Sequence, residues 1–229
     1  MLSSRQAGSF ADLRPLTEAG TLNDALLFGW LAARSVARGL PAPVADRGGF
    51  RVDTGGEVEI CRWAFTRPCA GLTELGQALD APGYFLKLCG NGVDLLAALP
   101  PRWRLQEPGY CMQGPENSPP PSALPAGYAL QIDRDARGSR VAILAPDGQL
   151  AATGTAAEAA GAFVYDRIIT EPDHRRKGLG RVVMAALRET RTDRAATELL
   201  VATDDGRALY TTLGWTVISP FVTAEIASA

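Results

Sequence analysis

The sequence has few residues of the kinds that bind metals: one histidine, His174, and four cysteines. The cysteines are Cys61, Cys69, Cys89 and Cys111. Zinc sites use cysteines and histidines at short, regular spacings, such as two cysteines separated by two residues. No cysteine here has such a partner or a neighbouring histidine. We therefore expect no metal site, and we interpret the cysteines as reduced thiols, mostly in the core, of a cytoplasmic protein.

Long apolar runs and an excess of positive charge are also missing. The longest apolar run, residues 25–33, is too short to cross a bilayer, which takes about 20 residues. Residues 1–6 lack the apolar centre of a secretory signal. The formal net charge is −2, which does not favour non-specific binding to nucleic acid. We therefore expect neither a membrane nor a nucleic-acid partner.

The remaining composition is that of a globular protein with a real core, since 46% of residues are hydrophobic and 21% charged. Residues 114–124 are rich in proline, which favours an extended spacer between domains. We therefore predict an N-terminal α/β domain over residues 1–113, a linker over 114–124 and a second domain over 125–229.

The first domain shows mixed helix and strand signals but no catalytic motif. After a polar, loop-like segment over residues 1–20, we predict helices at 25–38, 72–79 and 91–99, and strands at 49–53, 58–65, 84–89 and 103–105. Strands 49–53 and 58–65 are predicted to form a hairpin. We expect this domain to pack against the second one and to shape one wall of a cleft.

The second domain is richer in strand signals. Strands are predicted at 128–132, 140–145, 149–155, 162–170, 197–203, 215–219 and 222–226, with a short helix at 207–213. Pro220 separates the last two strands, and Gly214 ends the short helix.

The junction after strand 162–170 carries the clearest chemistry. Arg175, Arg176 and Lys177 are followed by Gly178 and Gly180, and an amphipathic helix begins there. The first N–H groups of a helix have no partner within it and attract anions. Glycine lets the backbone approach the anion closely. The junction therefore predicts a phosphate or pyrophosphate site, or else a glycine-containing turn into an ordinary helix.

Two motifs carry a resemblance to a known family. The pattern Arg-x-x-Gly-x-Gly of residues 175–180 resembles the acetyl-CoA pyrophosphate loop of the GCN5-related N-acetyltransferases (GNAT), and residues 208–215 resemble their second signature. The resemblance covers about residues 125–227. It implies an α/β (α+β) fold with a mixed, mostly antiparallel sheet and flanking helices.

This sequence departs from the family between its first two strands. The family usually has two helices there, whereas only residues 133–139 separate the strands here. We hypothesise that the N-terminal part, as a degenerate copy of the same fold, takes the place of those helices.

The resemblance implies that acetyl-CoA binds along strand 162–170 and the loop after it. The implied cofactor-binding residues are Ile168, Ile169, Thr170, Arg175, Arg176, Lys177, Gly178, Leu179, Gly180, Arg181 and Asp205. The end of the strand would pair with the pantetheine amides, and the amides of residues 176–180 would hold the pyrophosphate. For Asp205 the alternative, shared with Asp204, is an N-cap of the short helix.

The resemblance also implies direct attack of an amine on the thioester, which requires a base and an acid. Tyr210 occupies the position of the family's acid, with a core tyrosine as the alternative. Asp166 is the candidate base, with an ion pair to Arg167 as the alternative. Glu171 is a weaker candidate, and the family often uses a water chain instead.

The sequence thus predicts an N-acetyltransferase that moves an acetyl group from acetyl-CoA to a primary amine of a small molecule or protein, as a monomer or homodimer. A non-catalytic acyl-CoA sensor is the first alternative. A protein-interaction scaffold with a decayed CoA site is the second.

Overall fold

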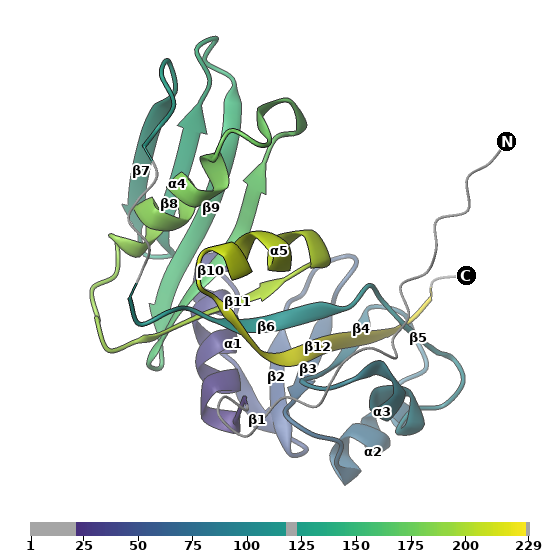
Figure 1. Ribbon diagram of the computed structural model, residues 1–229. Coiled ribbons are helices and arrows are strands. Elements are labelled where there is room, and N and C mark those ends of the chain that lie inside the picture. The colour runs from purple at the N-terminus through teal and green to yellow at the C-terminus, as the bar shows by residue number, and fades with distance from the viewer. Residues whose placement is uncertain (1–21, 118–122, 228–229) are drawn as a thin grey trace, which may run out of the picture.

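Twelve strands form one mixed, mostly antiparallel sheet in the computed structural model, which describes residues 22–117 and 123–227 (Figure 1). The strands are β1 (Val44–Asp46), β2 (Gly49–Asp53), β3 (Cys61–Phe65), β4 (Tyr84–Leu88), β5 (Trp103–Leu105), β6 (Gly109–Gln113), β7 (Ala129–Asp135), β8 (Gly138–Leu144), β9 (Leu150–Ala159), β10 (Ala162–Thr170), β11 (Thr197–Ala202) and β12 (Thr216–Ile226). Their order is β1-β2-β3-β4-β12-β6-β11-β10-β9-β8-β7, and β5 also pairs with β12.

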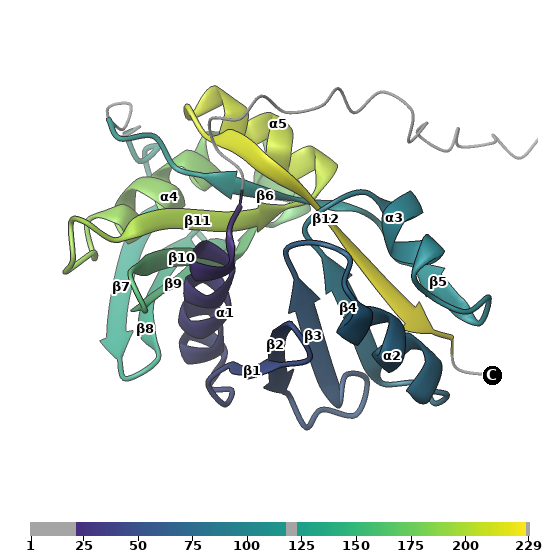
Figure 2. The same cartoon turned by 90° about the horizontal axis from the view of Figure 1, so that it is seen from below.

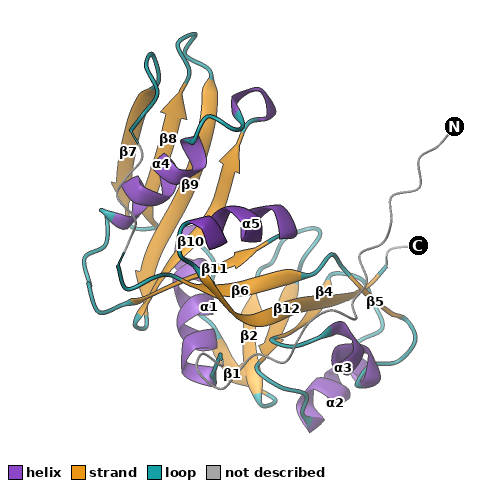
Figure 3. Cartoon of the chain, viewed as in Figure 1, coloured by secondary structure: helices purple, strands orange, loops and turns teal. Residues whose placement is uncertain are grey.

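Helices flank this sheet (Figure 3). They are α1 (Asp24–Arg38), α2 (Ala70–Ala78), α3 (Gly92–Ala97), α4 (Leu179–Arg188) and α5 (Asp204–Thr212), with a 3₁₀ turn, η2, at Pro172–His174. None of these helices is long and apolar enough to cross a membrane. The mixed, mostly antiparallel sheet and its flanking helices are the predicted fold class.

Helix α1 covers one face of β9 and β10, and α4 covers the other (Figure 2). The side chains of β10 alternate: Ala162 and Val164 pack on the α1 side, whereas Phe163 and Tyr165 pack on the α4 side. Gly29 permits the close approach of α1, because a Cβ there would lie 2.9 Å from the Ala160 carbonyl oxygen. Helix α1, from the N-terminal part, therefore covers the sheet face beside strands β7 and β8. No helix lies between these two strands along the chain.

The ends of α1 follow local rules that the sequence already shows. The Asn23 side chain accepts a hydrogen bond from the Leu26 N–H at 2.9 Å, and Gly39 closes the helix with a φ of 63°. These are an N-cap and a left-handed C-cap. The predicted helix at residues 25–38 is confirmed, as is the antiparallel β2–β3 hairpin.

Strand β12 corrects one prediction. Two strands separated by Pro220 were expected, but one continuous strand is present. It pairs with β6 over residues 216–221 and then with β4 from Val222 onwards. Pro220 is tolerated because it lies close to a bulge between Val217 and Ser219 and to this change of partner, where the regular ladder is already interrupted.

Strand β6 was not predicted, although its position is central. It comes before the proline-rich segment in sequence, yet it lies between β11 and β12 and is antiparallel to both. Strand β1 was also missed; it is three residues long. The division into domains at residues 114–124 stays a prediction, and the expected loop over residues 1–20 lies outside the described residues, as do residues 118–122 of the linker.

Candidate active site

The loop between η2 and α4 has an unusual run of unpaired backbone donors. Among the described residues, the amides of residues 176–180 donate to no backbone or side-chain acceptor, and the helical bonds begin with Arg181 and Val182 donating to the Gly178 carbonyl. Arg176 and Gly178 have positive φ angles of 64° and 80°. Successive N–H groups in such a turn form a concave anion site at the positive end of a helix.

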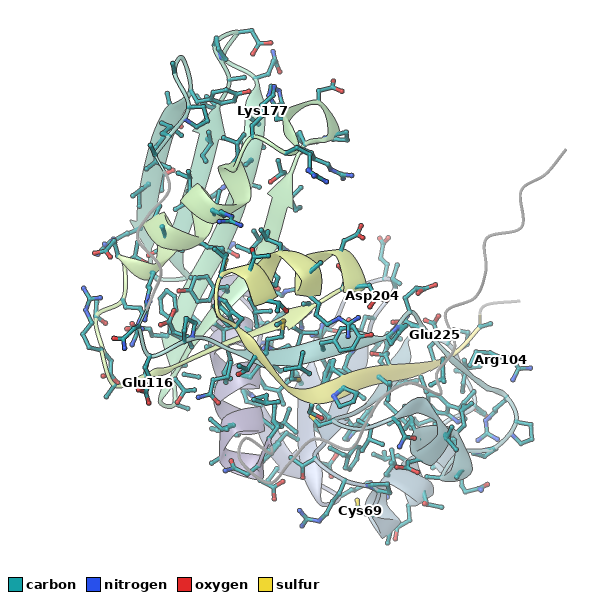
Figure 4. All side chains as sticks on the ribbon, in the orientation of Figure 1. Cys69, Arg104, Glu116, Lys177, Asp204 and Glu225 are labelled. Carbon is teal, nitrogen blue, oxygen red and sulfur yellow. The ribbon has the colours of Figure 1, made fainter. Side chains whose placement is uncertain are left out.

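Basic side chains surround this anion site. Lys177 reaches the hydroxyl of Tyr128 at 3.1 Å, and the same hydroxyl lies 2.9 Å from Nδ1 of His174. Arg181 donates to Thr212 of α5 at 3.0 Å. Arg175 donates to the carbonyl of the last β10 residue at 3.3 Å. Figure 4 labels Lys177 near the start of α4. These contacts tie the loop to its neighbours and keep positive charge beside the free amides.

Strands β10 and β11 separate before the end of β10, which was predicted to pair with the pantetheine amides. Their parallel pairing covers only Ala162–Val164 of β10. A bulge between Asp166 and Ile169 follows, opposite β9, and Arg167 within it has a φ of 54°. Beyond Val164, β10 has a stretch that is free of ladder pairing with β11, although the Asp166 and Thr170 carbonyls accept side-chain hydrogen bonds from Thr155 and Arg175. Ile168, Ile169 and Thr170 lie on this free stretch; Ile168 packs against the core, and Ile169 is exposed.

A cleft of about 610 Å³ opens at this separation. Strand β10 contributes Tyr165 and Asp166, and β11 contributes Val201 and Ala202. The other lining residues are Trp30, Arg34, Arg38, Lys87, Glu107, Pro108, Gly109, Thr203, Asp204, Asp205, Phe221 and Thr223. Helix α1 and strand β4 thus line part of the cleft.

Asp166 lies in this cleft and is held by two arginines of α1. Arg38 donates to both carboxylate oxygens, with Nε at 2.6 Å and a terminal nitrogen at 2.9 Å, and Nε of Arg34 lies 3.6 Å away. The sequence left open a catalytic base or an ion pair with Arg167. The pair forms with Arg38 and Arg34 instead. Two guanidinium groups stabilise the carboxylate, which favours the ion-pair alternative.

Tyr210 lies on α5 with 7% of its surface exposed, and its ring packs against Trp215 at a centroid distance of 6.1 Å. Burial raises the pKa of Tyr210 to about 12, so the hydroxyl keeps its proton at neutral pH. Tyr210 does not line the cleft itself. Its role as acid therefore stays a prediction.

The start of α5 corrects the expected cap. Thr203, not Asp204 or Asp205, is the N-cap, and its hydroxyl accepts the Gly206 N–H at 3.2 Å. Asp204 and Asp205 lie in the first turn and line the cleft.

The cleft residues missed by sequence reasoning include three cations, Arg34, Arg38 and Lys87. The two arginines are four residues apart in an otherwise apolar helix, which places them on one face. Lys87 interrupts the apolar strand Tyr84–Leu88. Burial lowers the pKa of Lys87 to about 8, against the opposing effect of Glu59. The sequence signal that could have identified these residues is a basic residue within an otherwise apolar helix or strand.

Comparisons with known proteins identify a domain in the chain and related folds. Residues 136–217 match the family model described as the acetyltransferase (GNAT) domain. A search of curated proteins finds no sequence match. Among solved structures, a GCN5-related N-acetyltransferase from Kribbella flavida is 15% identical, with a TM-score of 0.61, and the match covers 86% of this chain and 93% of that one.

Two further structures show the same extent of similarity. A GCN5-related N-acetyltransferase-like protein from Streptococcus suis has 15% identity and a TM-score of 0.59, over 84% of this chain and 93% of that one. A GNAT-family acetyltransferase from Novosphingobium aromaticivorans has 19% identity and a TM-score of 0.53, over 89% and 99%. At these identities the structures show the fold, and the shared fold includes most of the N-terminal part that the family model does not cover.

Proposed function

We propose that the GNAT acetyltransferase domain that the chain carries over residues 136–217 takes acetyl-CoA as its donor and acetylates a primary amine of a small molecule or protein. The observation that carries the proposal is the run of five unpaired amides, residues 176–180, at the start of α4. Unpaired amides at a helix N-terminus are donors that phosphate groups accept in proteins.

The proposed binding residues would contact successive parts of acetyl-CoA along the loop and the strand. The amides of residues 176–180 would hold the pyrophosphate, while the basic residues 175–177 and Arg181 add positive charge. The free edge of β10, residues 168–170, would pair with the pantetheine amides as a neighbouring strand does. Asp205 lines the cleft and would lie beside the pantetheine at the start of α5.

Acetyl-CoA, when bound, supplies a thioester whose carbonyl accepts the amine and whose thiolate leaves. Tyr210, which keeps its proton, would donate a hydrogen bond to the departing sulfur. Asp166 was the candidate base, but both of its carboxylate oxygens are engaged by Arg34 and Arg38. We therefore propose that Asp166 positions these arginines and that water in the cleft takes the amine proton.

Two measurements on the purified chain test the proposal. Calorimetric titration with acetyl-CoA, with desulfo-CoA and longer acyl-CoA controls, is expected to show micromolar binding. Thiol release in the presence of a panel of amines is expected to exceed the rate without amine. Binding without turnover on any amine would instead support the sensor alternative, and absence of binding would overturn the assignment of the loop. The cytoplasmic location and the monomeric or dimeric state stay expectations from the sequence.

A further inference from the structure

One wall of the cleft carries more positive charge than its carboxylates neutralise. Four cations, Arg34, Arg38, Arg62 and Lys87, gather with three carboxylates, Glu59, Asp166 and Glu225. Arg38 pairs with Asp166 at 2.6 Å, and the buried Arg62 pairs with Glu59 at 2.6 Å. Four positive charges less three negative charges leave a formal charge of +1 on the cluster.

Among the described residues, Arg34 and Lys87 have no carboxylate within hydrogen-bond distance, since Nε of Arg34 lies 3.6 Å from Asp166, and both cations line the cleft. The Arg34 guanidinium lies 5.3 Å from the ring centre of Trp30 and donates no hydrogen bond to any residue that the structure describes. The Lys87 ammonium donates one hydrogen bond, to the Thr223 hydroxyl at 3.2 Å. An ammonium has three donors and a guanidinium five. Both groups therefore keep donors that a ligand in the cleft can use.

The opposite rim of the cleft is acidic. Glu107, Asp204 and Asp205 line it at the start of β6 and α5, and Figure 4 labels Asp204 at the start of α5. Helix α5 packs in the core on the α4 side of the sheet, whereas α1 packs on the other side. A ligand that spans the cleft would thus meet positive charge at one end and negative charge at the other.

From this charge arrangement we propose that the acceptor amine also carries a carboxylate, and that Arg34 and Lys87 bind this carboxylate while the amine faces the separation of β10 and β11. This inference rests on the proposed function and specifies its substrate class. The guanidinium of Arg34 matches the two oxygens of a carboxylate.

The test uses the full chain and matched acceptors: a panel of amino acids, each with its carboxamide and its decarboxylated amine. We expect kcat/KM for the best acids, at saturating acetyl-CoA, to exceed that of their amides by about tenfold or more, since hydrogen bonds between charged groups have effects of that size. Calorimetry of the CoA-saturated protein with N-acetylated acids and amides gives the same comparison without turnover.

Two variants test whether Arg34 and Lys87 are the residues that bind the carboxylate of the acceptor. Arg34→Gln and Lys87→Met should each raise KM for the acids by about tenfold and leave the amides within about threefold. Arg67→Gln is the matched control, because the Arg67 side chain is 75% exposed and does not line the cleft. This variant should change KM neither for the acids nor for the amides. Arg34→Gln alters a side chain at the cleft surface, so it should keep the fold even if Lys87→Met does not.

Several outcomes would overturn the inference. One is a panel in which no acid is bound or turned over better than its amide. Others are a preference for phosphorylated amines, and equal losses on acids and amides in both variants. Binding of acetyl-CoA, measured on the same preparations, separates this failure from failure of the proposed function, because the donor site lies at the α4 loop and contains neither Arg34 nor Lys87.

Discussion

Gly178 offers the sharpest test of the anion site at α4. It has a φ of 80°, and a Cβ built on it would meet no atom within 4 Å. A side chain there is strained but not obstructed. Gly178→Glu should therefore fold, and it would place a carboxylate beside the five free amides.

The expected loss of acetyl-CoA binding follows from charge. A left-handed backbone costs a residue other than glycine about 1–2 kcal/mol, which affects stability. Two unit charges about 4 Å apart repel by roughly 1 kcal/mol in water and roughly 4 kcal/mol at a protein surface. A pyrophosphate with two charges would thus lose at least about 2 kcal/mol, or a roughly 30-fold increase in Kd.

Two control variants separate charge from strain. Gly178→Gln has the same strain without the charge and should weaken binding by less than about tenfold. Gly161→Glu adds both strain and charge at the other end of β10, where the φ is 73° and no atom lies within 4 Å; it should bind acetyl-CoA normally. All three variants should lower Tm by a few degrees, about 2–8 °C.

The assay is calorimetric titration with acetyl-CoA at about 0.15 M salt, beside thermal unfolding of each variant. A folded Gly178→Glu variant with unchanged Kd would refute the assignment of the loop as a pyrophosphate site. Equal losses in Gly178→Gln and Gly178→Glu would show that the backbone, not the charge, controls binding.

Three more predictions address the acid, the cleft and the packing. Tyr210→Phe should lower kcat by about 10²-fold with Kd for acetyl-CoA within about twofold; an unchanged rate would remove Tyr210 from the acid role. Since the pKa of Lys87 is lowered to about 8, its charge is present below that pH and lost above it. The preference for acids over their amides, divided by the same preference in Lys87→Met, should therefore fall as pH rises through about 8, because the titration of the acceptor amines cancels in this ratio. Gly29→Val should lower the free energy of unfolding by about 1–3 kcal/mol, because its Cβ would lie 2.9 Å from the Ala160 carbonyl oxygen; an unchanged Tm would contradict the close packing of α1 on the sheet.

Features that depend on neighbours along the chain were predictable from the sequence. Strand 162–170 was predicted with its observed bounds, and Gly178 marked the start of α4, because β propensity, turn residues and helical periodicity act within a few residues. The anion site was recognisable for the same reason: a helix start, two glycines and three cations are adjacent in sequence.

Contacts between residues that lie far apart in the sequence were not predictable and are seen only in the folded chain. Arg38 and Asp166 are 128 positions apart, so the sequence suggested Arg167 as the partner of Asp166, whereas α1 brings Arg38 and Arg34 to it. Strand β6 was missed because its neighbours in the sheet, β11 and β12, follow it by more than eighty residues, and β12 runs through Pro220 because pairing with β6 and β4 supports it on both sides of the proline. Local propensity acts over a few residues, while strand pairing and buried ion pairs depend on contacts that form only when the chain is folded.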